Sequence, residues 1–215
     1  VLCPMKVLVA SFLALLSTGL SACPSSHFQP TTYFGEAFGD SRPVTEFEFA
    51  NSKEDLDLII IEYQTFEPGY VPVFATSILR AESGKFRVAL VRAKEPKLKG
   101  GKPLPTAAFR ELPAQLARRA KDSAALVLRN TRYPEEPCTD IWFDGYVIQA
   151  LVPHAEGFRE LVGEVYVPPA DSEAGAIVAL GRSFRAFVER KANEADLELA
   201  VLAVERHNFS SKPTP

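Results

Sequence analysis

The stretch "LDLIIIEYQTF" at residues 56–66 decides the class of fold, because its centre is apolar and β-branched without interruption. A strand with one face in solvent alternates apolar and polar residues, whereas a strand buried on both faces is a continuous apolar run. The stretch therefore predicts a central strand of a sheet, covered on both faces.

Further strand signals lie on both sides of this run. Before it, "VTEFEF" at 44–49 alternates aromatic and acidic residues, which is the period of a half-buried strand. After it, "YVPVFATSILR" at 70–80 and "KFRVALVRA" at 85–93 are joined through "ESGK" at 82–85, whose glycine gives the backbone freedom that a tight hairpin needs. These segments predict an antiparallel sheet.

A helix is predicted from about Leu112, after a polar, proline-rich connection at 94–111. In "LPAQLARRAKDSAALVLRNTRY" the apolar residues Leu112, Leu116, Ala120 and Val127 share one side at 100° per residue. The opposite side carries a basic stripe of Arg118, Lys121, Arg129 and Arg132. Two interpretations of the stripe stay open: a solvated helix face whose long side chains also cover apolar surface, or a docking face for an acidic partner.

The second half of the chain returns to strands and then closes with helices. "CTDIWFDGYVIQALVP" at 138–153 and "GFRELVGEVYVPP" at 157–169 have strand character. A helix at 172–192 is predicted to be capped by Asp171 or Ser172, and one at 194–206 by Asn193, because short polar side chains accept hydrogen bonds from the free N–H groups of a first turn.

Strands grouped early, then a helix, two strands and more helices are typical of an α+β fold. We expect an antiparallel sheet of about six strands packed against two or three helices, in a single domain over residues 43–208. The helices from Leu112 and Ser172 are expected to cover one face of the sheet. Residues 209–215, "SSKPTP" and its neighbour, are expected to be a disordered tail.

The N-terminal segment "MKVLVASFLALLSTGLSAC" at 5–23 has the layout of a secretory signal. A charged residue, Lys6, precedes an apolar run at 7–16, and small residues follow. A bilayer-spanning helix needs roughly 20 apolar residues, so this run is too short to span. Residues 1–22 are expected to be removed, with residues 1–4 lying upstream of the true start at Met5.

The end of this segment, Leu20-Ser21-Ala22-Cys23, resembles the lipobox of bacterial lipoproteins. The resemblance covers only the first 23 residues, and it implies a diacylglyceryl group on the sulfur of Cys23 with cleavage before it. Acyl chains bind membranes in proportion to their buried methylenes, and two or more chains anchor a protein stably. The resemblance therefore implies a lipid-anchored, periplasm-facing protein of the cell envelope, with the outer membrane favoured because Pro24 is not the aspartate common in inner-membrane lipoproteins.

Composition narrows the classes of partner. Loss of Lys6 moves the formal net charge from −3 to −4, and a mildly acidic chain without long charge blocks is a poor candidate for binding nucleic acid. Residues 23–42 mix proline, serine, glycine and aromatics without a period, so they are expected to tether the domain, with Phe28, Tyr33, Phe34 and Phe38 docked on it. Cys138 is left as the one unmodified cysteine and is expected to be buried.

Catalytic and metal-binding signatures are mostly missing from the sequence. Neither a Gly-x-Ser-x-Gly elbow nor a His-Glu-x-x-His motif occurs, and the scattered histidines and cysteines lack metal-ligand spacing, so neither metal nor cofactor is predicted. The remaining candidate is a ligand site of Asp140, Trp142, Asp144 and Tyr146, since paired carboxylates can hydrolyse glycosides. Turn chemistry at Asp144-Gly145 accounts for one of these carboxylates equally well.

Two functional hypotheses follow from these patterns. The first is a non-catalytic lipoprotein that binds another protein, either as an accessory of an envelope machine or as an immunity factor against a toxin. The second is a lipoprotein that binds or hydrolyses glycan or cell-wall material. A surface carrying the basic stripe favours the first, and a deep pocket gathering Trp142, Tyr146 and carboxylates favours the second.

Overall fold

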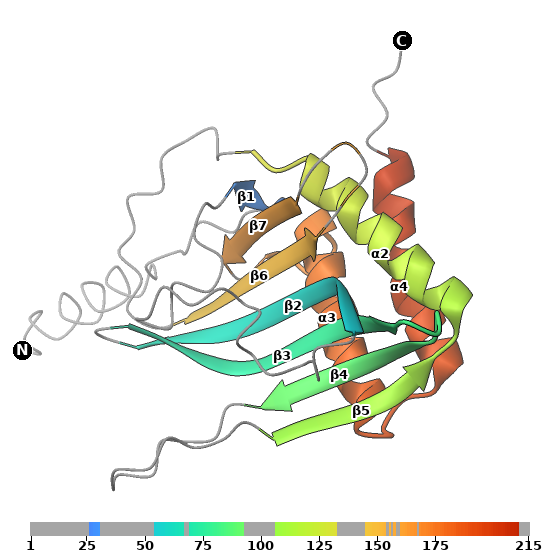
Figure 1. Ribbon diagram of the computed structural model, residues 1–215. Coiled ribbons are helices and arrows are strands. Elements are labelled where there is room, and N and C mark those ends of the chain that lie inside the picture. Colours follow the sequence, from blue (N-terminus) through green and yellow to red (C-terminus); the bar gives the residue numbers. More distant parts are fainter. Residues whose placement is uncertain are drawn as a thin grey trace, which may run out of the picture.

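A computed structural model of the chain describes residues 26–30, 54–66, 69–92, 106–132, 145–153, 155, 157, 160–166 and 168–210. Seven strands and three helices are described in these ranges (Figure 1). The strands are β1 (Gln29–Pro30), β2 (Glu54–Phe66), β3 (Gly69–Ala81), β4 (Phe86–Arg92), β5 (Thr106–Leu112), β6 (Gly145–Pro153) and β7 (Glu160–Tyr166). The helices are α2 (Ala114–Arg129), α3 (Glu173–Val188) and α4 (Glu194–Ser210).

The strands form one antiparallel sheet in the order β1-β7-β6-β2-β3-β4-β5. This confirms the predicted α+β class, and it places the predicted central strand, β2, in the middle of the sheet. The sheet has one strand more than the expected six. Two of its strands, β1 and β5, arise from segments predicted as tether and connection, whereas the strand predicted at 44–49 lies outside the described residues.

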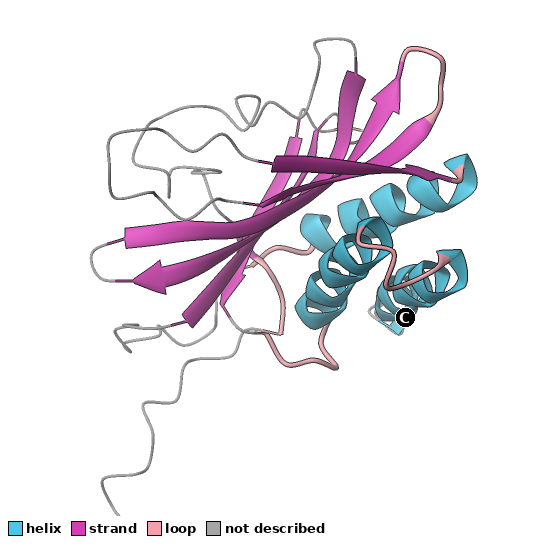
Figure 2. Ribbon diagram, turned by 90° about the horizontal axis from the view of Figure 1, so that it is seen from below, coloured by secondary structure: helices cyan, strands magenta, loops and turns pink. Residues whose placement is uncertain are grey.

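The side chains of residues 57–63 in β2 are buried on both faces of the sheet, as the continuous apolar run predicted. Leu58 and Ile60 belong to the core cluster beneath the helices, and Ile59, Ile61 and Tyr63 belong to a second buried cluster on the opposite face. The three described helices lie together on one face of the sheet (Figure 2). Because successive side chains of a strand point to opposite faces, the alternation in β2 shows which residues of the sheet face the helices and which face away from them.

Helices α2 and α3 lie on the sheet, and α4 packs against both of them. The predicted apolar side of α2 faces inward, since Leu116, Ala120 and Val127 are buried. Helix α3 approaches β2 closely at Gly181, where an added Cβ would lie 2.9 Å from Cγ2 of Ile60. A glycine there lets the helix backbone rest against the central strand.

Side-chain caps begin α3 and α4 as predicted. The hydroxyl of Ser172 accepts a hydrogen bond from the Gly175 N–H at 3.0 Å, so Ser172, not Asp171, is the cap of α3. At α4, Asn193 Oδ1 accepts from the N–H groups of Ala195 at 2.8 Å and Asp196 at 3.1 Å. Asp196 Oδ2 in turn accepts from the Asn193 N–H at 2.9 Å, which completes a reciprocal capping box.

Part of the segment predicted as a tether packs on the domain. Phe28 is buried in the helix-side core, which confirms its expected docking, and β1 pairs with β7. The Phe28 carbonyl accepts a hydrogen bond from the Arg132 N–H at 3.1 Å, and the Ser26 carbonyl accepts one from the Ala174 N–H at 3.1 Å. The other aromatic residues of that segment lie outside the described residues.

Candidate functional site

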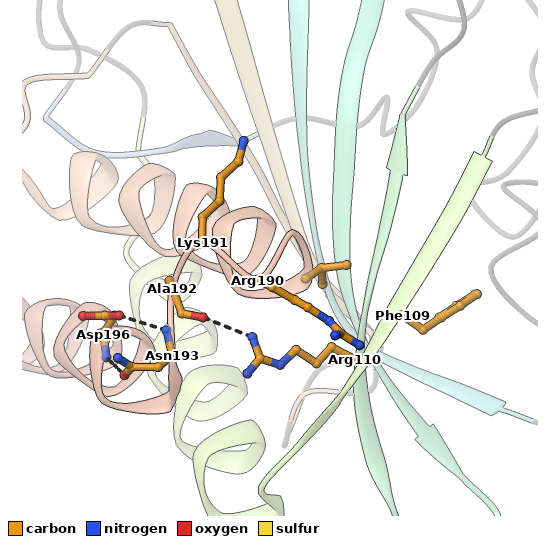
Figure 3. Close-up of a pocket in the computed structure, with 8 residues that line it drawn as sticks. Phe109, Arg110, Arg190, Lys191, Ala192, Asn193 and Asp196 are labelled. Carbon is orange, nitrogen blue, oxygen red and sulfur yellow. Dashed lines mark hydrogen bonds between the residues drawn. The ribbon is translucent and has the colours of Figure 1, made fainter.

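A pocket of about 550 Å³ lies between β5 and the turn that joins α3 to α4 (Figure 3). Its lining is strongly polar and carries more positive than negative side chains. The lining residues are Phe109, Arg110, Val188, Arg190, Lys191, Ala192, Asn193 and Asp196. Since polar and apolar groups converge there in a concave space, it is the candidate binding site.

The pocket follows the outer edge of the sheet. β5 is the last strand in the sheet order, and the pocket is lined by two successive residues of it, Phe109 and Arg110. Because successive side chains on a strand point to opposite faces, a space that touches both residues must reach the strand's edge. The site therefore lies at the last strand of the described sheet.

Arg110 fixes the α3–α4 turn onto this edge. Its Nη1 donates hydrogen bonds to the carbonyls of Phe187 at 2.6 Å and Ala192 at 3.1 Å. The guanidinium also lies 3.8 Å from the centroid of the Phe187 ring, which is a close cation–π contact. A single side chain thus donates to two carbonyls at and just beyond the C-terminus of α3. Its Nη1 group holds the turn against β5.

The turn itself contains a backbone outlier at Arg190, whose φ is 59°. The Arg190 N–H donates to the Phe187 carbonyl and the Lys191 N–H to the Ala186 carbonyl, in the pattern of a Schellman motif. The left-handed position of that motif is usually a glycine, because a side chain there costs about 1 to 2 kcal/mol. Arginine occupies it here in spite of that cost.

The Arg190 guanidinium is available to a ligand. In Figure 3 it extends from the turn toward Arg110 and β5, and among the described residues it makes neither a side-chain hydrogen bond nor an ion pair. The neighbouring charged groups already have hydrogen-bond or ion-pair partners. Lys191 Nζ lies 2.7 Å from Glu189 Oε2, and the Asp196 carboxylate is used in the α4 cap. Arg190 is thus the cation that the site presents.

An exposed aromatic ring completes the edge. Phe109 is 42% exposed, and the guanidinium of Arg87 lies 3.9 Å from its ring centroid. Arg87 is itself held by an ion pair with Glu54. In Figure 3 the ring points away from Arg190, on the other side of β5, so it offers a partner an apolar contact across the strand from the anion-binding group.

The residues of the predicted basic stripe have unequal surroundings. Arg118, Arg129 and Arg132 are exposed, whereas Lys121 is half-buried and donates to Asp57 Oδ1 at 3.3 Å. Arg118 lies 5.9 Å from the centroid of the Phe86 ring. The stripe therefore combines a structural lysine with three surface arginines.

The remaining predicted site residues are mostly not described. Cys23, Cys138, Asp140, Trp142 and Asp144 lie outside the described residues, and Tyr146 lies in β6 with its side chain outside them. In the opposite direction, sequence reasoning missed Arg110 and Arg190. The one available signal was an arginine-lysine pair at the end of a predicted helix, which is also what helix-dipole stabilisation produces.

The chain has no match among protein-family models, curated proteins or solved structures. Over the part of the chain that the structure describes, none of the helices combines the length and apolarity needed to cross a bilayer. Within the same ranges, histidine, cysteine, aspartate and glutamate side chains do not gather in threes as metal ligands. Function must therefore be argued from the pocket itself.

Proposed function

We propose that the protein is a lipid-anchored protein of the cell envelope that binds an acidic segment of another protein in the pocket beside β5, without catalysis. The observation that carries this proposal is Arg190. It holds a left-handed backbone conformation that favours glycine, and its guanidinium has no partner among the described residues. Strained residues of this kind cluster at functional sites.

An arginine in this setting suits a carboxylate. The guanidinium is planar and always charged, and it binds carboxylates through two parallel hydrogen bonds. The neighbouring Asp196 forms no ion pair with Arg190 among the described residues, and its Oδ2 accepts the Asn193 N–H. The exposed ring of Phe109 adds apolar contact area on the other side of β5.

The composition of the pocket favours a protein partner over a glycan. Sugar-binding sites depend on aromatic platforms and free carboxylates, whereas this pocket has one aromatic residue, and its one carboxylate is used in a helix cap. The exposed arginines of the basic stripe, Arg118, Arg129 and Arg132, would steer an acidic partner toward the same protein by long-range attraction.

A lipid on Cys23 fits this role. Anchoring confines the domain to the membrane surface, and so raises its effective concentration where a membrane-bound partner or an incoming toxin arrives. An accessory of an envelope machine and an immunity factor both need this arrangement. We place the domain on the periplasmic side, with the outer membrane favoured.

The binding role is tested by selecting 12-residue peptides from a display library on the full-length protein purified in detergent. We expect the enriched peptides to carry aspartate or glutamate, and we expect Arg190→Glu to weaken their binding at least tenfold, which is about 1.4 kcal/mol. The matched control is Lys85→Glu, a charge reversal of an exposed residue on the β3–β4 turn. Selection without acidic enrichment, or equal losses in both variants, would refute the proposal.

The anchoring is tested separately by the change Cys23→Ser. We expect the wild-type protein to sediment with the membrane fraction and to incorporate labelled palmitate. The Cys23→Ser protein should take up no palmitate. Equal palmitate labelling of the two proteins would show that the lipid is not on this residue.

A further inference from the structure

Among the described strands, only β4 pairs with β5, and none pairs with the outer edge of β5. β5 is the last strand in the order of the described sheet and pairs with β4 from Thr106 to Leu112. A strand at the edge of a sheet presents a row of free N–H and C=O groups that can pair with another chain. The pocket that holds Arg190 runs along this same edge.

The register of the sheet identifies the residues whose backbone groups point outward. In the β3–β4 hairpin the Ala81 N–H donates to the Lys85 carbonyl, so the pair that follows, Arg80 and Phe86, is not bonded to each other. In an antiparallel ladder the bonding direction alternates residue by residue. Phe86 and every second residue after it in β4 therefore face β5.

The same alternation carries across to β5. Val88 faces β5 and pairs with Arg110, so the backbone groups of Arg110 face inward to β4. The neighbouring residues Phe109 and Glu111 consequently direct their N–H and C=O groups away from the sheet. Phe109 and Arg190 line the same pocket, and Figure 3 shows the Arg190 side chain extending toward β5, so the outward backbone groups of Phe109 border the space that this guanidinium enters.

We infer that the partner segment binds as an additional β-strand on the outer edge of β5, with an acidic side chain reaching Arg190. This inference rests on the proposed function and names its mode of binding. Strand addition derives affinity from main-chain hydrogen bonds and specificity from pockets that take alternate side chains. Here the edge backbone at Phe109 would supply the main-chain hydrogen bonds, and the pocket would take the acidic side chain.

The charges at this edge favour an acidic segment over a second copy of the chain. In a symmetric pairing of two β5 edges, each copy would bring three cations, Arg110, Arg190 and Lys191, against two carboxylates, Glu111 and Asp196, so both copies would carry a net positive charge to the seam. Like charges placed opposite each other across a sheet are destabilising. A partner strand with carboxylates at alternate positions meets the same edge with opposite charge.

The test uses the acidic peptide with the highest affinity from the selection described above, made as a series in which one backbone nitrogen at a time is methylated. Strand addition uses the N–H groups of every second residue, so methylation should weaken binding about tenfold at alternate positions and less than about twofold between them. Phe109→Pro should weaken binding about tenfold more than Phe109→Ala, because both remove the ring but only proline also removes the N–H.

Other results would distinguish strand addition from two alternatives. A flat methylation profile, with binding still lost in Arg190→Glu, would overturn strand addition and leave the acidic-partner proposal intact. Concentration-dependent dimers in analytical ultracentrifugation that Phe109→Pro abolishes and the peptide displaces would assign the edge to a second copy. If Phe109→Pro does not fold, the peptide series alone decides, because it leaves the protein unchanged.

Discussion

At the scale of single residues, Arg190 links the stability of the domain to the proposed binding. It occupies the left-handed position of the C-terminal motif of α3. The arginine side chain strains the backbone there, and it places a guanidinium at the pocket. Stability and function often oppose each other at such positions. The opposition gives a prediction with two readouts of opposite sign.

We predict that Arg190→Gly stabilises the domain by about 1 kcal/mol, because glycine adopts the left-handed conformation without the steric cost of a Cβ. The same change should reduce binding of acidic peptides at least tenfold. Urea unfolding and peptide titration of one preparation measure both effects. A variant that is less stable than the wild type, or that binds as well, would contradict this account of the residue.

Arg110 has the complementary role of holding the turn in place. Arg110→Met keeps much of the apolar stem but removes the guanidinium donor from the carbonyls of Phe187 and Ala192, of which the Phe187 carbonyl retains the Arg190 N–H. We expect a loss of about 2 kcal/mol in the free energy of unfolding, since hydrogen bonds from charged groups contribute about 1.5 to 3 kcal/mol. Arg118→Met, on an exposed residue of α2, is the matched control and should change stability by less than about 0.5 kcal/mol.

The sequence could predict caps at this scale but not the pocket. Ser172 and Asn193 act on residues two or three positions away, so local spacing was sufficient to assign them. Arg110 instead bonds to carbonyls 77 and 82 residues further along the chain. Nothing local to the residue indicates such a partner.

At the scale of elements, β2 and β5 show what a sequence pattern can and cannot predict. The apolar run of β2 is explained only by burial on both faces, so it predicted a central strand. β5 has the sequence "TAAFREL", with one β-branched residue and two alanines, and it was predicted as part of a connection. It becomes a strand because it pairs with β4 over seven residues, and this pairing is a tertiary effect that overrides weak propensity.

The cap of α4 gives a prediction for an element. Asn193→Ala removes the acceptor of the Ala195 and Asp196 N–H groups, and we expect it to cost about 1 kcal/mol. Asn193→Ser should recover most of that loss, because serine is also a strong cap. Thermal unfolding of the two variants measures the difference, and equal stability of Asn193→Ala and the wild type would contradict the role of the cap.

At the scale of the whole molecule, an ion-pair cluster joins helices that are distant in sequence. Arg119 of α2 donates to Glu205 of α4 through Nε and Nη2, each at 2.9 Å, and to Glu198 through Nη1 at 2.9 Å. These hydrogen bonds lower the pKa of the Glu205 carboxyl and raise the pKa of Arg119. The cluster fastens the outer helix α4 to the helix layer.

The lowered pKa of Glu205 makes this contribution depend on pH. The folded state binds a proton at Glu205 less readily than the unfolded state, whose glutamate titrates near 4.3. The stabilisation is therefore present above about pH 4.3, and it is lost as the pH falls through the lower folded-state pKa. We predict that Glu205→Gln destabilises the domain by about 1 kcal/mol at pH 7, with a smaller difference from the wild type at pH 3.

Urea unfolding of the two proteins at both pH values measures this change. Glu198→Gln is the control, because its side chain is 53% exposed whereas that of Glu205 is 24% exposed. It should show a smaller loss at pH 7. A Glu205→Gln penalty that stays constant from pH 7 to pH 3 would show that the pair stabilises by packing and not by charge.

Binding of an acidic partner segment at the edge of β5 can be detected in cells. A photo-crosslinking amino acid is placed at Phe109 of the full-length, lipidated protein, and the crosslinked peptide is mapped by mass spectrometry. Leu126 on α2 is the control position, since it is 45% exposed and Phe109 is 42% exposed. We expect a crosslink from position 109 to an acidic segment of another protein, lost in Arg190→Glu and absent from position 126. Adducts that survive Arg190→Glu, or that form equally from both positions, would contradict it.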